Sequence, residues 1–121
     1  MEDVEKIEKI SELLIRTGMK KSHAKVLASL FILKKASQKD LESLGNLRQS
    51  NISKTLRFLE KNGIICTCSK QILEKGRPRK IYSLTIPFEE IVKQHIEKKR
   101  AELEKIKKKL NELKEIVTSS K

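Results

Sequence analysis

Apolar residues at helical spacing begin at the N-terminus of the chain. Val4, Ile7, Ile10 and Leu14 are separated mainly by Glu and Lys. Residues three and four apart lie on one face of a helix, so this pattern predicts a short amphipathic helix over the first 17 positions. Gly18 follows where such a helix would end.

Two further helices are expected before position 46. An apolar set over 23–35 follows Ser22, a residue type that favours the N-cap position. Ser37 can cap the next helix, and Asp40 stands where it completes a short capping box. This third helix is brief, because Gly45-Asn46 predicts a turn.

The fourth helix, RQSNISKTLRFLEKNG at 48–63, has two contrasting faces. Ile52, Leu56 and Leu59 form one apolar stripe, and Asn62-Gly63 has the composition of a helix C-cap. The opposite face, at 100° per residue, is polar and basic and holds no acid. Its members are Ser50, Ser53, Lys54, Arg57 and Lys61, with Asn51 at its edge.

The period then changes to that of strands. The β-branched runs at 64–73 and 80–86 flank KGRPR, which predicts a β-hairpin with a long basic tip. From 88 to 117 the pattern is again helical, for about 30 residues or roughly 45 Å. Its apolar seam, interrupted at Lys99, consists of Val92, Ile96, Leu103, Ile106, Leu110, Leu113 and Val117.

This order of elements predicts a mainly α fold with a small β-hairpin, in the α+β class. We expect an N-terminal amphipathic helix over 1–21, a winged helix-turn-helix domain over 22–87 and a long C-terminal helix over 88–121. Apolar residues make up only 37% of the 121 residues, a small supply for the core of a monomer. Burial of the long helix against a second copy is therefore expected, and the alternative is pairing with the first helix of the same chain.

The charge indicates the kind of partner. The formal net charge is +12, which favours a polyanion, with nucleic acid before a membrane surface. Ten basic and four acidic residues fall between 37 and 87, the most one-sided part of the chain. No apolar run approaches the length of a membrane span, and the N-terminus is too charged for a signal peptide, so we expect a cytoplasmic protein.

The stretch SQKDLESLGNLRQSNISKTLRFLEKNGII, followed by KGRPRKIYSLT, resembles the DNA-binding domain of the MarR/TrmB group of prokaryotic transcriptional regulators, of archaeal type. It is also similar in plan to the ArsR group. The resemblance covers roughly 22–86. It implies a homodimer that binds double-stranded DNA, with the fourth helix in the major groove and the hairpin, or wing, in the neighbouring minor groove.

The resemblance places specific residues at the DNA. It puts Gln49, Ser50, Asn51, Ser53, Lys54 and Arg57 at groove-facing positions. The chemistry agrees, because Asn and Gln can bond adenine, Arg can bond guanine, and Lys and Ser suit phosphates or either. Phosphate contacts are expected around Ser37 and Lys39 through free backbone N–H groups at the start of the third helix. Arg48 stands where the group often has a small N-cap, so either Asn46 caps this helix or Arg48 contacts phosphate.

The wing departs from the common pattern of the group, an Asp–Arg pair at the tip. Taken alone, KGRPRK looks like an AT-hook or a solvated turn; between two strands and after the fourth helix we interpret it as the tip of the wing. Gly76 permits close approach and Pro78 fixes its own backbone angle, so a stiff tip is expected. Its DNA-contacting residues would be Lys75, Arg77, Arg79 and Lys80, with Arg favoured in a narrow minor groove.

Other functions find weaker support. Cys66 and Cys68 lie two apart in the first wing strand, and we interpret both as small apolar filler on one face, with metal or thiol sensing as alternatives. No Ser-His-Asp set, Gly-rich phosphate loop or HExxH motif is present, so we expect no enzyme, catalytic residue, cofactor or metal. A winged-helix protein-interaction module and a non-specific chromatin-type DNA binder remain as alternatives. The sequence identifies neither an effector nor the orientation of the paired C-terminal helices.

Overall fold

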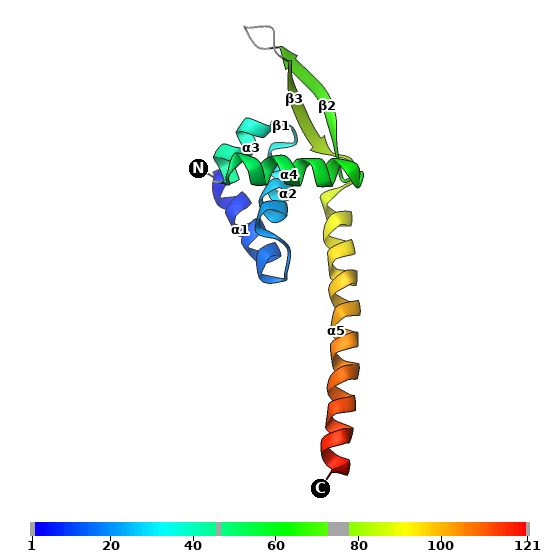
Figure 1. The fold of residues 1–121 in the computed structure, drawn as a ribbon. Coiled ribbons are helices and arrows are strands. Elements are labelled where there is room, and N and C mark those ends of the chain that lie inside the picture. The colour runs from blue at the N-terminus through cyan, green and yellow to red at the C-terminus, as the bar shows by residue number, and fades with distance from the viewer. Residues whose placement is uncertain (1, 46, 73–77, 121) are drawn as a thin grey trace. The chain divides into compact units, whose positions relative to one another are not determined.

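The computed structural model describes residues 2–45, 47–72 and 78–120. The chain divides into two compact units, Met1–Phe88 and Glu89–Lys121, which are described separately below. The chain has the α+β winged-helix fold that the sequence predicts: it is mainly helical and carries a small antiparallel sheet (Figure 1).

Within its described residues the first unit has four helices, and apolar periodicity predicts each of them. They are α1 (Glu2–Arg16), α2 (Lys21–Leu33), α3 (Gln38–Gly45) and α4 (Gln49–Lys61). The apolar stripe of α4 is buried as expected: Ile52, Leu56 and Leu59 are each at most 2% exposed. They join a core that includes Leu30 and Leu41, and burying one such side chain contributes about 1.5–3 kcal/mol.

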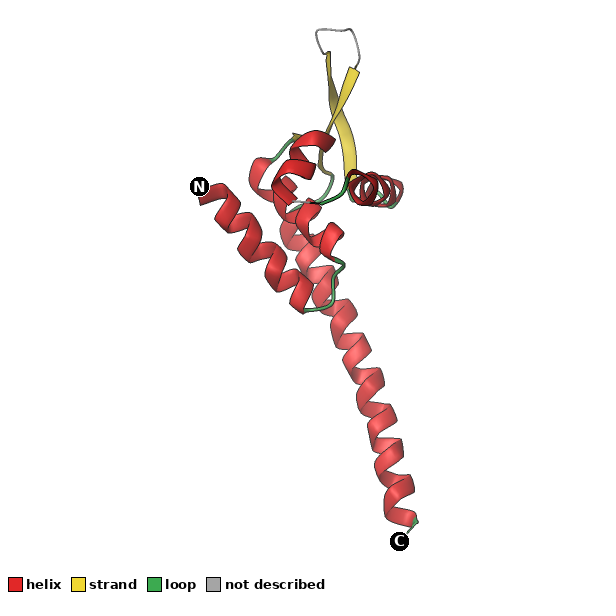
Figure 2. Cartoon of the chain, turned by 60° about the vertical axis from the view of Figure 1, so that its left-hand side comes forward, coloured by secondary structure: helices red, strands yellow, loops and turns green. Residues whose placement is uncertain are grey.

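In the described part of the chain the sheet has three strands, one more than the sequence analysis found. The hairpin strands β2 (Ile65–Ile72) and β3 (Pro78–Leu84) are joined by β1 (Ala36–Ser37), in the order β1-β3-β2. Ala36 pairs with Tyr82 and Ser37 with Ile81, so the short segment before α3 is attached to the base of the wing. The β2–β3 ribbon extends well beyond the helices of this unit (Figure 2).

Two helices of this unit end in the same backbone motif. After α4, Ile64 N donates to Leu59 O, Gly63 N donates to Glu60 O, and Gly63 has a φ of +73°. This is the Schellman arrangement, in which a left-handed residue closes the helix. Gly18, with a φ of 101°, closes α1 in the same way. The endings predicted at Gly18 and Asn62-Gly63 are confirmed.

The predicted N-cap at Ser22 is wrong. The helix begins two residues earlier than expected, at Lys21, and its N-cap residue is Lys20, which makes no side-chain capping hydrogen bond. Ser22 Oγ instead accepts a hydrogen bond of 2.9 Å from Thr55 Oγ1, which links the first turn of α2 to the middle of α4. The Ser22 hydroxyl, which the local sequence pattern predicts as a helix cap, therefore makes a tertiary hydrogen bond instead.

The two cysteines occupy different environments because β2 contains a bulge. Thr67 pairs with Tyr82 and Ser69 pairs with the adjacent residue, Ile81, so Cys68 is an extra residue in this strand. Cys68 is exposed, and the expectation that it fills apolar space is wrong; Cys66 is half-buried, with Sγ 3.5 Å from Ser83 Oγ. Both thiols are free.

The second unit is the helix α5 (Phe88–Ser119), whose 32 residues correspond to about 48 Å. From Ile96 onward its large apolar residues are about half exposed or more. They are Ile96, Leu103, Ile106, Leu110, Leu113, Ile116 and Val117. Among the described residues, no helix combines the length and apolarity that crossing a bilayer requires.

Candidate nucleic-acid interface

The outer face of α4 presents polar and basic side chains. Opposite the buried stripe, the side chains of five predicted DNA-contacting residues are exposed: Gln49, Ser50, Asn51, Lys54 and Arg57. Arg48, the N-cap residue of this helix, is also exposed and makes no side-chain capping hydrogen bond. Asn46, the alternative cap, lies outside the described residues.

Ser53 differs from the other predicted contacts. It is half-buried, and its Oγ accepts a hydrogen bond of 2.9 Å from Gln38 Nε2 at the start of α3. The Ser53 hydroxyl is therefore hydrogen-bonded to Gln38, a residue that the sequence analysis did not single out. Gln38 Nε2 donates this bond, while the carbonyl oxygen of the same amide remains able to accept another.

Ser37 is a capping residue and is buried, at 1% exposure. Its Oγ accepts from Asp40 N at 3.2 Å, and its own N–H donates to Asp40 Oδ2 at 3.1 Å, which confirms the predicted capping box. Because this N–H is already bonded and the side chain is enclosed, the phosphate contact expected at Ser37 is not supported. Lys39, in the same turn, is exposed.

The described part of the wing carries two of the four predicted basic contacts. Arg79 and Lys80 are in β3, paired with Gln71 and Lys70 of β2, so they belong to the ribbon and not to its tip. Pro78 is the first residue of that strand and not a tip residue. Lys75 and Arg77 lie outside the described residues.

The surface between α4 and the wing is hollowed. One hollow of about 480 Å³ is lined by Gln38, Lys39, Glu42, Gln49, Arg79, Lys80 and Tyr82. A second, of about 290 Å³, is lined by Gln38, Ser53, Arg57, Glu60, Lys80 and Tyr82. The two share Gln38, Lys80 and Tyr82. We call them together the wing-side groove; it brings predicted contacts from α3, α4 and β3 onto one concave surface.

The wing-side groove also contains acid, which the analysis of the α4 face missed. Glu60 is one turn beyond Arg57 and accepts a hydrogen bond of 2.8 Å from Thr67 Oγ1 on β2, so it ties the end of α4 to the wing. Burial, and then the negative charge of Glu60, raise the pKa of Tyr82 above 10.0. Tyr82 therefore keeps its phenolic proton at neutral pH.

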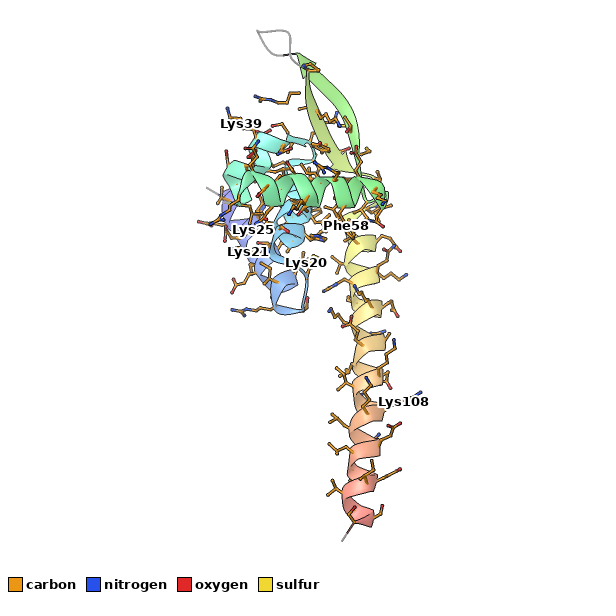
Figure 3. The ribbon with its side chains drawn as sticks, in the orientation of Figure 1. Lys20, Lys21, Lys25, Lys39, Phe58 and Lys108 are labelled. Carbon is orange, nitrogen blue, oxygen red and sulfur yellow. The ribbon has the colours of Figure 1, made fainter. Side chains whose placement is uncertain are left out.

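A third hollow, of about 280 Å³, borders α4 at the start of α2. Its lining residues are Lys20, Ser22, His23, Asn51, Lys54, Thr55 and Phe58. In Figure 3, Lys20 and Lys39 lie on opposite sides of the α4 ribbon, so this α2-side hollow and the wing-side groove flank the helix. The sequence analysis did not find it, because the α2 residues are about 30 positions from their α4 neighbours.

Phe58 and His23 form part of the wall of the α2-side hollow. Phe58 is 51% exposed, and its ring centroid is 5.1 Å from that of His23. Burial, and then the positive charge of Lys20, lower the pKa of His23 below 6.5. The imidazole is thus neutral at pH 7 in the free protein.

Other chemistries find no support in the part of the chain that the structure describes. Within residues 2–45, 47–72 and 78–120, no group of three or more His, Cys, Asp or Glu side chains is placed to hold a metal ion. Cys66 and Cys68 are free thiols and, among those residues, belong to no such group.

Comparison with known proteins identifies the fold. No protein family and no curated protein matches the sequence. A transcriptional regulator homologue from Pyrococcus horikoshii has a similar structure, with a TM-score of 0.54 and 23% identity over 88% of this chain and 98% of its own. A possible transcriptional regulator from Methanosarcina mazei gives a TM-score of 0.52 and 19% identity, over 90% and 87% of the two chains. The similarity thus extends over most of each chain and supports the winged-helix fold.

Proposed function

We propose that this protein is a sequence-preferring, double-stranded DNA-binding transcriptional regulator that acts as a homodimer in the cytoplasm and has no enzymatic activity. The observation that carries the proposal is the outer face of α4, where Gln49, Ser50, Asn51, Lys54 and Arg57 are all exposed. Two archaeal proteins of similar fold are described as regulators of transcription, which supports the same function here.

In this proposal α4 enters the major groove. Gln49 and Asn51 would bond adenine, Arg57 would bond guanine, and Ser50 and Lys54 suit bases or phosphates. Ser53 is half-buried, so its contribution is made together with Gln38, which holds it. Lys39 and Arg48 are exposed near the N-termini of α3 and α4, where positive charge and backbone N–H groups favour phosphate.

The wing supplies the second part of the contact. Arg79 and Lys80 line the wing-side groove beside α4, and in this proposal they bind the DNA backbone. The sequence predicts that Lys75 and Arg77 also contact DNA, and in this proposal they reach the minor groove, where the negative potential of A·T-rich DNA favours Arg. Glu60 lies at the end of the wing-side groove near Arg57, and its hydrogen bond from Thr67 holds it against β2.

The apolar seam of α5 would form the dimer interface. Its residues are Val92, Ile96, Leu103, Ile106, Leu110, Leu113 and Val117, and most are about half exposed in the single chain. An apolar seam of this length on a helix is normally covered, and a second copy offers the same seam. Two copies would read half-sites about one helical turn, roughly 34–36 Å, apart.

Selection of bound duplexes from a random pool, together with mass measurement of the free and bound protein, tests the proposal. We expect a pseudo-palindromic consensus and a complex that contains two chains. A steep salt dependence without any consensus would instead indicate a non-specific chromatin-type binder. Absence of binding at low salt would indicate a protein-interaction module.

A further inference from the structure

The α2-side hollow has the composition of an anion site. Two lysines, one from the N-cap position of α2 and one from α4, line it together with His23, Asn51 and hydroxyl groups, and no carboxylate is among its lining residues. The wing-side groove, in contrast, includes Glu42 and Glu60. Of the two surfaces that flank α4, the α2-side hollow is therefore the one whose lining residues are all basic or neutral.

Hydrogen-bond donors face the hollow from both helices. Thr55 Oγ1 donates to Ser22 Oγ, so the proton of Ser22 remains to be donated elsewhere. In the first turn of α2, the first intrahelical bond is made by Ala24 N to Lys20 O, which leaves the preceding N–H groups without a partner inside the helix. Asn51 adds a side-chain amide from α4.

Asn51 and Lys54 connect the hollow to the surface that would read DNA. Both are exposed on the outer face of α4 and both also line the hollow. A group bound there would consequently be next to whatever α4 contacts. The major groove is bordered by a phosphate backbone on each side, so a helix lying in it has one backbone on either flank.

We propose that the α2-side hollow binds a backbone phosphate of duplex DNA, on the flank of α4 that faces away from the wing. This inference rests on the proposed function. Lys20 and Lys54 supply charge, and Ser22 and Asn51 supply hydrogen bonds. Phe58 and His23, whose rings are in contact, form part of the wall of the site. The recognition helix is thus held between two phosphate contacts, one to α2 and one to the wing.

The first test is the salt dependence of binding for Lys20→Gln. Each phosphate contact contributes about 0.9 to the slope of log affinity against log salt, and the proposed homodimer carries two copies of Lys20, so we expect the slope to fall by about 2. Affinity of the dimer at 0.15 M salt should fall about 30-fold, and by the same factor on the selected and the random duplex, because a phosphate contact carries no base information. The matched control is Lys9→Gln, which removes the same charge from an exposed residue of α1.

A second test locates the contact. Single methylphosphonate substitutions, which remove one backbone charge, are placed in turn along the selected duplex. We expect one position in each half-site at which substitution weakens binding by the wild-type protein but not by Lys20→Gln. These positions should differ from the ones at which substitution loses its effect on Lys80→Gln.

The outcomes separate this inference from the proposed function. If wild type binds no duplex, the proposed function itself fails. If wild type selects a consensus but Lys20→Gln keeps the full salt slope and every methylphosphonate effect, the α2-side phosphate site is wrong and the regulator remains. Equal slope changes for Lys20→Gln and Lys9→Gln would also overturn it, because they would reflect net charge alone.

Discussion

Gln38 donates a hydrogen bond of 2.9 Å from Nε2 to Ser53 Oγ, and this bond joins the start of α3 to the middle of α4. Both residues also line the wing-side groove. The bond thus fixes the relation between the two helices of the helix-turn-helix at the surface proposed to face DNA.

Loss of this bond should be measurable as a coupling energy. In a double-mutant cycle with Gln38→Ala and Ser53→Ala, we expect a coupling of about 0.5–1.5 kcal/mol in the free energy of unfolding. Denaturant unfolding of the four proteins gives the value. Ser43→Ala is the control on α3, since its hydroxyl donates to Lys39 O of its own helix; a coupling near zero between Gln38 and Ser53 would contradict the assignment.

Arg57 and Arg79 should differ in what they contribute to DNA binding. Arg57 is exposed on the outer face of α4, and Arg79 lies in β3 beside the wing-side groove. We expect Arg57→Ala to cost about 1–3 kcal/mol for each half-site of the selected duplex and to relax the sequence preference. Arg79→Ala should weaken selected and random duplexes by a similar factor. Titration of each variant against both duplexes checks this, and equal losses for both variants on both duplexes would refute the division.

The seam of α5 can be tested at its centre. Leu110 is 58% exposed in the single chain, and Lys in its place would put two charges into a symmetric interface. Losing about 1.5–3 kcal/mol of burial per copy should weaken dimerisation at least about 100-fold. Sedimentation over a range of concentrations measures this. Lys108→Ala, at an exposed position two residues away, should leave the dimer intact; a Leu110→Lys protein that remains dimeric would show that the seam is not the interface.

His23 should make the free protein less stable in mild acid. Burial and the charge of Lys20 lower its pKa from 6.5 in the fold, so the unfolded chain binds the proton more readily. This contribution to stability is complete above pH 6.5 and is lost as the pH falls toward the lowered pKa. Denaturant unfolding at pH 7.5 and pH 5 should therefore show a larger loss for wild type than for His23→Gln. Because the pKa of His95 is lowered too, the comparison with this variant is needed to isolate His23; identical pH dependences would contradict it.

Gly63→Ala should destabilise the fold through backbone conformation alone. A Cβ at this position would meet no atom within 4 Å, yet the residue has a φ of +73°. A left-handed conformation costs an ordinary L-residue roughly 1–2 kcal/mol, and that loss is expected in the free energy of unfolding. Gly63→Asn should cost less, since Asn tolerates this region better. Equal stability of Gly63→Ala and wild type would rule out the strain.

Local features of the chain were predictable because local interactions determine them. Helix α4, its buried stripe and its glycine ending follow from periodicity and from the left-handed residue that closes a helix. The Ser37–Asp40 capping box is also local, since its partners are three residues apart. These elements were confirmed without reference to any distant partner.

Long-range features were not predictable in this way. Strand β1 has two residues and no periodicity, and it exists because β3 is beside it. The bulge at Cys68 depends on the pairing register of two strands. Ser22 does not cap α2 as expected, and its hydroxyl instead accepts a hydrogen bond from Thr55, 33 residues away. The α2-side hollow likewise requires the packing of α2 on α4. Each depends on contacts between distant segments, which a one-dimensional pattern does not record.

The attachment of Ser37 restricts how this sequence can diverge. The residue pairs with Ile81 in the sheet, caps α3 through its hydroxyl and is enclosed by the core. A replacement must be small, must suit an extended backbone and must accept a hydrogen bond, and Thr comes nearest to meeting all three conditions. Over evolutionary time we expect substitutions at this position to be rarer than at the exposed residues of α4. Related chains could then acquire new target DNA sequences while the attachment of the wing to α3 is unchanged.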